Sequence, residues 1–186
     1  LYRGGGMEWV LYEENEKCAL LKDLGLNVNL APVADVLMAS APELEGRSYG
    51  KNPQLVSDMA WQMASGLRDQ GIIPCYKLFP GHGTIFNNAH NTPVSHTRSL
   101  SDMKKMELIP FQYAIEKDIE MIMISHLMAR EIDSYLPASL SYNVITLLLR
   151  QQMGYDGVVI TDALRMDAIQ EKYSTAEATR LAIRAG

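Results

Sequence analysis

Hydrophobic and polar positions follow two recurring patterns along the chain. Apolar residues at helical spacing occur in five segments: 8–24, 53–71, 101–117, 143–153 and 164–185. Short and nearly continuous apolar runs lie between them: 26–33, 72–79, 119–126 and 157–162. Runs of this kind are typical of strands that are buried on both faces. We therefore predict four strands alternating with helices, with the 101–117 helix bent or restarted at Pro110 and the last helix broken near residues 173–174.

Alternating strands and helices predict a parallel sheet with right-handed crossovers. An ionisable residue stands at or after the end of each predicted strand: Asp35, Lys77, His126 and Asp162. Active sites lie at this end of the strands in (β/α) barrels and also in open doubly wound sheets. The pattern alone leaves both architectures open.

Composition excludes several classes of protein. The 186 residues are enough for one domain with a sizeable core. The formal net charge of -5 and the absence of a basic stripe argue against a nucleic-acid partner. The longest apolar runs are too short to cross a membrane. Cys18 and Cys75 are far apart and outside any CxxC pattern, which argues against a zinc site or a disulfide framework.

The loop KLFPGHGTIFNNAH, residues 77–90, is the most distinctive polar segment. It lacks the glycine spacing of phosphate-binding loops, and it has no HxH or HxxxH pair, so we predict no metal site. Pro80, Gly81 and Gly83 predict a tight turn in which His82 has a structural role. His90 lies further along the loop. Because imidazole titrates near neutrality, His90 is a candidate general acid/base.

Three other side chains have both a structural and a functional interpretation. Asp162 either caps the helix that follows its strand or presents a carboxylate to a ligand. Lys77 is either solvated or hydrogen-bonded to ligand hydroxyls. Arg47, in the loop after the first strand, is either a surface ion-pair partner or a ligand clamp.

Four motifs, taken together and in this order, resemble glycoside hydrolase family 3, in particular its bacterial β-N-acetylglucosaminidase branch. LGLNVNLAPVADV resembles the fourth barrel strand, and GRSYGKNP resembles the next loop with its substrate-binding arginine, here Arg47. The loop 77–90 is similar to the signature of that branch. MGYDGVVITDALRM resembles the strand that ends in the catalytic nucleophile, here Asp162.

The resemblance implies a partial TIM-type (β/α)8 barrel holding family strands four to seven. It also implies retaining hydrolysis of terminal β-linked N-acetylglucosaminides, including those derived from peptidoglycan. Asp162 would be the nucleophile and His90 the acid/base, oriented by Asn88. Substrate would be bound at the strand ends by three further residues, Arg47, Lys77 and His126. The family implies no metal and no organic cofactor.

Two positions depart from the family pattern. Leu78 replaces a histidine and cannot hydrogen-bond a sugar, and Asn88 replaces an aspartate. Asn88 can orient an imidazole, but it cannot supply the negative charge that favours imidazolium. We therefore expect a weakened acid step. The alternative is an inactive fragment, or a carbohydrate-binding or structural module with the same fold.

The extent of the resemblance suggests that residues 1–186 are a single partial barrel domain, truncated at both ends. Half a barrel has two open strand edges, which are prone to pair with other chains. We therefore expect either that a second copy or another partner chain completes the barrel, or that the chain is part of a larger protein. The sequence leaves open whether the protein is cytoplasmic or exported.

Overall fold

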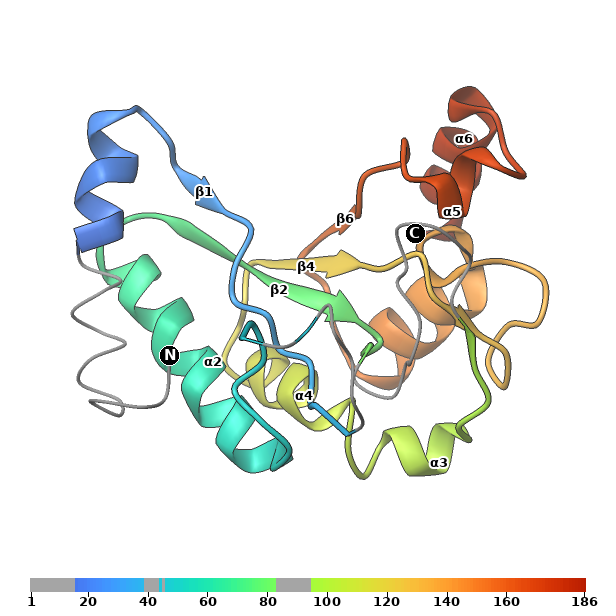
Figure 1. Cartoon of the computed structure of the whole chain (residues 1–186), viewed down its shortest axis with the longest axis horizontal. Coiled ribbons are helices and arrows are strands. Elements are labelled where there is room, and N and C mark those ends of the chain that lie inside the picture. Colours follow the sequence, from blue (N-terminus) through green and yellow to red (C-terminus); the bar gives the residue numbers. More distant parts are fainter. Residues whose placement is uncertain (1–15, 39–43, 45, 83–94) are drawn as a thin grey trace.

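The chain is built around a four-stranded parallel sheet, seen at the centre of Figure 1. The structure is a computed structural model that describes residues 16–38, 44, 46–82 and 95–186. Its strands, in spatial order, are β1 (Val28–Asn29), β2 (Ile73–Phe79), β4 (Met121–Ile124) and β6 (Val158–Thr161). Every neighbouring pair is parallel, which confirms the four predicted strands.

The helices follow the predicted segments with some differences in extent. They are α2 (Pro53–Asp69), α3 (Leu100–Met103), α4 (Ile109–Ile115), η1 (Ala138–Leu140), η2 (Asn143–Gln152), α5 (Asp167–Gln170) and α6 (Thr175–Ala185). The predicted 8–24 helix is described from residue 16 and is helical to residue 23. In the described part of the chain, no helix is both long and apolar enough to cross a membrane.

Local chemistry explains where these helices begin. The Asn52 side chain accepts a hydrogen bond from Leu55 N at 3.0 Å and so caps α2. The predicted 101–117 helix is split by a turn, and α4 restarts with Pro110 in its first turn, where its missing N–H costs nothing. The predicted break near residue 174 is also confirmed, because Ser174 caps α6.

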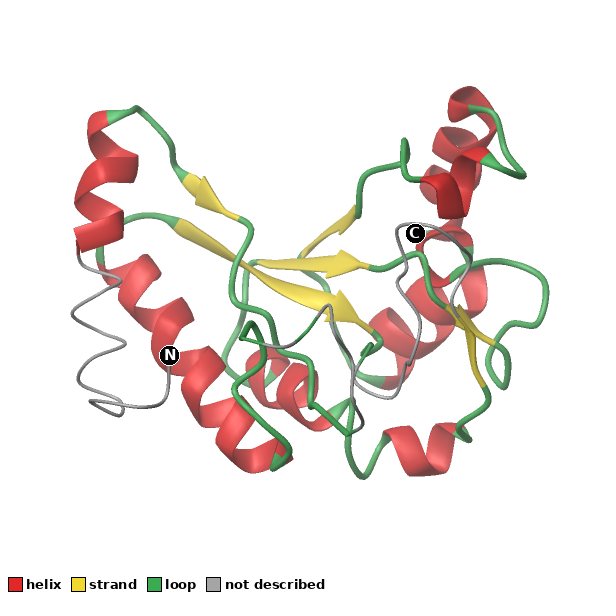
Figure 2. Ribbon diagram, viewed as in Figure 1, coloured by secondary structure: helices red, strands yellow, loops and turns green. Residues whose placement is uncertain are grey.

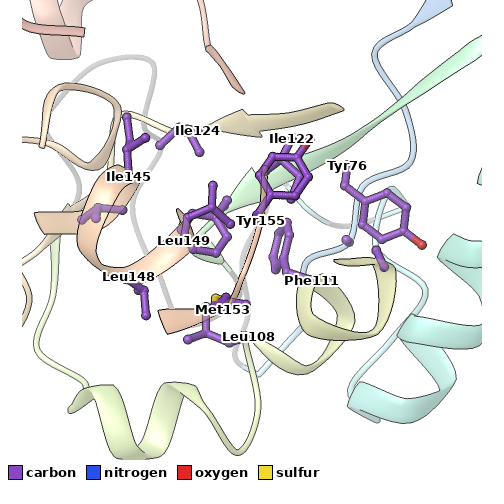
Figure 3. Packing of buried hydrophobic residues seen from close by; sticks show 14 of the residues in the cluster. Tyr76, Leu108, Phe111, Ile122, Ile124, Ile145, Leu148, Leu149, Met153 and Tyr155 are labelled. Atoms are coloured by element: carbon purple, nitrogen blue, oxygen red, sulfur yellow. The ribbon is translucent and has the colours of Figure 1, made fainter. Parts of the chain in front are cut away.

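The main core lies between the sheet and the helices α2, α4 and η2, which cover one face in Figure 2. Phe111 of α4 packs edge-on against Phe79, with ring centroids 5.2 Å apart. Tyr76 and Ile122 point to the same face from adjacent strands (Figure 3). These buried residues anchor the strands, so the strand ends are held in a fixed arrangement.

The other face of the sheet carries the alternate residues. Cys75 and Met123 are buried there, with Ile160 packed beside them, and Leu78 joins them because the register of β2 shifts between Tyr76 and Phe79. Side chains two apart on a strand share a face. Lys77 and Asp162 follow Cys75 and Ile160 by two residues, and Lys77 interacts electrostatically with both Cys75 and Asp162, which places the two charged residues on this second face.

A second, two-stranded sheet was not predicted from the sequence. β3 (Ser95–His96) pairs in parallel with β5 (Met128–Ala129), within the region expected to be loop. It ties the segment before α3 to the loop that follows β4.

Candidate active site

The strand register brings the polar strand ends together. Val33 lies opposite Lys77 in an isolated parallel bridge, and Ile124 lies between Phe79 and Thr161. The residues that follow these positions, including His126 and Asp162, therefore emerge at one edge of the sheet. This is the edge at which parallel α/β folds bind ligands.

Lys77 is half-buried at the end of β2 and is surrounded by charge. Burial is the main cause that lowers its pKa, and the positive charge of Arg47 lowers it further. The carboxylates of Asp162 and Asp35 act in the opposite direction. The charges of Arg47, Asp35 and Asp162, which lie far apart in sequence, therefore all act on the Lys77 ammonium group.

Asp162 stands at the end of β6 with its side chain half-exposed. Its amide donates to Ile124 O at 2.9 Å, and its Oδ1 accepts from Ala163 N at 2.7 Å. The capping interpretation of Asp162 is wrong. The next helix, α5, begins only at Asp167, and the residue at its N-cap is Met166.

His126 is buried, with 4% of its surface exposed, and both ring nitrogens contact protein. Nε2 lies 3.0 Å from Ala163 O, and Nδ1 lies 2.7 Å from Ser139 Oγ. A carbonyl oxygen only accepts, so Nε2 carries the hydrogen and Nδ1 of the neutral ring accepts from Ser139. Burial lowers the pKa of His126, while the Ala163 hydrogen bond and Asp162 oppose this. The ring therefore contacts the residue next to Asp162.

The turn at residues 79–82 is buried. His82 is 7% exposed, and its amide donates to Asp35 Oδ1, which agrees with a structural role for His82. Gly81 has φ 118° and lies so close to Glu107 that an added Cβ would be 2.7 Å from the Glu107 Cβ. Only glycine fits both restrictions.

Asp35 is a residue whose role the sequence did not reveal. It is completely buried, and its carboxylate accepts from Leu78 N at 3.1 Å as well as from His82 N. Burial raises its pKa from 3.8 to about 6, against the effect of the two amides and of Arg47 and Lys77. The sequence does show a carboxylate directly after an apolar strand. It does not show the partners of that carboxylate, because Leu78 and His82 lie 43 and 47 residues away.

Comparison with known proteins identifies the family. The profile of the glycosyl hydrolase family 3 N-terminal domain matches residues 15–186, which is most of the chain. The chain belongs to glycosyl hydrolase family 3.

Relatives in this family include several curated hexosaminidases. Beta-hexosaminidase LpqI of Mycobacterium tuberculosis is 35% identical over 173 residues, which cover 89% of this chain and 44% of LpqI. The beta-hexosaminidase of Thiobacillus denitrificans is 32% identical over 167 residues, covering 89% and 46%. The chain therefore spans less than half the length of these family 3 relatives.

Solved family 3 structures share the fold. A family 3 β-N-acetylglucosaminidase from Paenibacillus superposes with a TM-score of 0.94 at 34% identity, covering 98% of this chain and 35% of that one. This confirms that the parallel sheet with its flanking helices is part of a TIM-type barrel rather than an open doubly wound sheet.

Two of the predicted family 3 residues, His90 and Asn88, lie outside the described residues. Arg47 is described and exposed, in the loop that follows β1. Across residues 16–38, 44, 46–82 and 95–186, no group of three His, Cys, Asp or Glu side chains is arranged to hold a metal ion.

Proposed function

We propose that this chain carries part of the active site of a retaining glycosidase that cleaves terminal β-linked N-acetylglucosaminides, including peptidoglycan-derived ones. One observation carries the proposal. A half-exposed carboxylate, Asp162, lies on the same sheet face as Lys77 and interacts with its charge. A carboxylate nucleophile beside groups that bind hydroxyls is what retaining hydrolysis needs. The family 3 relatives that are hexosaminidases support the choice of sugar.

In the proposed mechanism, Asp162 attacks the anomeric carbon and forms a glycosyl-enzyme. His90 protonates the departing oxygen, and then takes a proton from the water that hydrolyses the intermediate. Asn88 orients the His90 imidazole through its amide. Lys77 and Arg47 donate hydrogen bonds to sugar hydroxyls, as ammonium and guanidinium groups do readily.

His126 has an indirect part in substrate binding. Both of its ring nitrogens are engaged by Ser139 and by the carbonyl of Ala163. We therefore propose that His126 fixes the backbone directly after Asp162 and thereby aims the carboxylate at the sugar.

Hydrolysis of a chromogenic N-acetylglucosaminide, compared with the matching glucoside, tests this function. We expect cleavage of the N-acetylglucosaminide, and loss of cleavage in Asp162→Ala. Equal cleavage of both substrates would contradict the choice of sugar. Unchanged activity in Asp162→Ala would contradict the nucleophile.

A carbohydrate-binding or structural module is the second candidate function. Two observations favour it: Leu78 is buried in an apolar cluster with Cys75 and Met123, and Asn88 replaces a carboxylate. Leu78 therefore offers no polar atom of its side chain to a sugar. Binding of N-acetylglucosamine by equilibrium dialysis, without cleavage of the chromogenic substrate, would support this candidate over the enzyme.

We also propose that residues 1–186 form one partial barrel domain whose sheet is completed by a second copy, by a partner chain, or by further segments of a larger protein. Among the described strands, β1 and β6 are the edges, and Leu26, Leu30 and Val158 beside them are exposed apolar residues. Sedimentation velocity of the purified chain tests pairing. A stable dimer is expected, and a stable monomer at low concentration would contradict pairing with a second copy.

A further inference from the structure

Asp35 lies where the backbone pairing between β2 and the segment that follows β1 comes to an end. Before this point, main-chain groups bond each other: Lys77 N donates to Pro32 O at 3.1 Å, and Ala34 N donates to Lys77 O. The next amide along β2, that of Leu78, donates to Asp35 Oδ2 instead. The side chain of Asp35 thus continues the ladder as an acceptor.

The same carboxylate reaches across the turn that follows. Its Oδ1 accepts from His82 N, while Gly81 N donates to Leu78 O at 2.8 Å inside the turn. A carboxylate has two acceptor oxygens, so one side chain can bind both amides at once. The ionised group therefore clamps both ends of the segment that follows Lys77.

The backbone of Asp35 holds a second loop, the one that carries Arg47. Ser48 Oγ donates to Asp35 O at 2.7 Å, and Gly50 N donates to Ser48 Oγ at 3.1 Å. Asp35 consequently connects the two segments that bear Arg47 and Lys77, the proposed sugar-binding cations.

We propose that Asp35 is a positioning residue for saccharide binding, whose ionised carboxylate clamps the Leu78 and His82 amides and so aligns Lys77 with Arg47. Protonation of the Asp35 carboxylate turns one of its two acceptor oxygens into an O–H donor. That O–H would face an amide N–H, which is also a donor, so one of the two hydrogen bonds is lost. The alignment is then lost, and the affinity for sugar falls. This inference rests on the proposed function only for the identity of the ligand.

Burial of Asp35, together with the amides and charges around it, sets the pH at which the clamp opens. Burial raises its pKa to about 6, and the amides of His82 and Leu78 and the charges of Arg47 and Lys77 oppose that rise. Asp162 also interacts electrostatically with Lys77. His82 also carries a titratable imidazole, so its contribution has to be measured separately.

Amide chemical shifts of the whole chain test the clamp directly. Between about pH 4.5 and 7.5, the Leu78 and His82 amide protons are expected to move downfield together, with a midpoint near the pKa of Asp35. Asp35→Asn should abolish this titration, since an amide side chain does not ionise. His82→Gln should preserve the titration of the Leu78 amide. If neither amide responds in the wild-type chain, or if both still respond in folded Asp35→Asn, the clamp is wrong.

Binding of N-acetylglucosamine tests the positioning role. For Asp35→Asn we expect roughly tenfold weaker binding near neutrality, which is the scale of one lost charge-assisted hydrogen bond. The wild-type affinity should fall below about pH 6, while that of Asp35→Asn should stay flat. Asp69→Asn, an exposed change on α2, is the matched control and should leave both unchanged. Equal, pH-independent affinities of wild type and Asp35→Asn would overturn the positioning role. If the wild type binds no sugar, the proposed function fails, and the amide shifts still decide the clamp.

Discussion

The ends of β2 and β6 carry the two oppositely charged groups of the candidate site, and the protein holds them differently. After β2, the backbone is fixed from both sides. Asp35 accepts from Leu78 N and His82 N, and the amide and hydroxyl of Ser125 both donate to Phe79 O, at 2.9 and 3.1 Å. After β6, a ladder bond holds the Asp162 amide, and His126 holds the next carbonyl.

This difference matches the tasks of the two side chains. Lys77 would bind a hydroxyl in a fixed direction, and a rigid backbone lowers the entropy that binding costs. Asp162 would form and break a covalent bond, so its carboxylate has to remain reachable. It is half-exposed, whereas Asp35 is completely buried. The same type of side chain thus serves as a structural acceptor at one strand end and as the candidate nucleophile at another.

Removal of the Asp162 carboxylate should have the largest effect. Asp162→Ala is expected to reduce hydrolysis of a chromogenic N-acetylglucosaminide on the order of 10⁴-fold, because no other group would form the glycosyl-enzyme. The matched control is Asp156→Ala, an exposed aspartate just before the other end of β6. A comparable loss in both variants would mean that the effect is not specific to the nucleophile.

Gly81→Ala should break the rigid end of β2. It forces an L side chain into a positive φ and brings a methyl group against Glu107, so we expect the free energy of unfolding to fall by roughly 2–5 kcal/mol. Gly71 also has a positive φ, but an added Cβ there would meet nothing within 4 Å. Urea denaturation of Gly71→Ala should therefore show a smaller loss, of roughly 1–2 kcal/mol from backbone strain alone. Equal losses would rule out the close contact as a cause.

The pH dependence of stability should reveal the cost of keeping Asp35 ionised. Its pKa is raised from 3.8 to about 6, so the folded state binds more protons than the unfolded state between these values. The stability it contributes is complete below about pH 4 and is lost as the pH rises to 6, by about 3 kcal/mol. Asp35→Asn should lack this decline. An identical pH dependence in the variant, measured by urea denaturation, would show that another group is responsible.

Ser139→Ala should have the smallest effect and should act at the β6 end. It removes the hydrogen bond to Nδ1 of buried His126, which we expect to cost about 1–2 kcal/mol of unfolding free energy.

The pKa of His126 is lowered below 6.5 by burial. The stability that His126 contributes is therefore present above that pH and is lost as the pH falls. Ser65→Ala, which removes a local helix hydrogen bond, is the control. Thermal denaturation showing equal losses would argue against a special role for the Ser139 contact.

The sheet was predictable because its strands are short apolar runs, and the segments between them have apolar residues at helical spacing. The position of the candidate site followed from the sheet, since the C-terminal ends of parallel strands share one edge. Lys77 and Asp162 could be assigned to that edge without knowing their contacts. The β3–β5 pair was not predictable, because two-residue strands are too short to show a period.

The roles of individual side chains were less predictable, because they depend on distant partners. The sequence is equally compatible with capping by Asp162, yet the following helix begins five residues later. The ring of His126 is fixed by Ser139 and Ala163, 13 and 37 residues away. Asp35 binds amides, which every residue except proline carries, so no side-chain pattern indicates its partners.

The clamp formed by Asp35 makes the backbone shape of the loop at residues 78–82 independent of the side chains that the loop carries. The Asp35 carboxylate binds the main-chain amides of Leu78 and His82 and not their side chains. A change of side chain at either position therefore does not remove the acceptor that holds the loop. Evolution or a protein engineer can therefore vary the side chain at position 78 while the cation before it stays in place. Leu78, which stands where the family pattern has a histidine, is one such variation. In this region the backbone of the loop can therefore keep its shape while the side chain at position 78 changes.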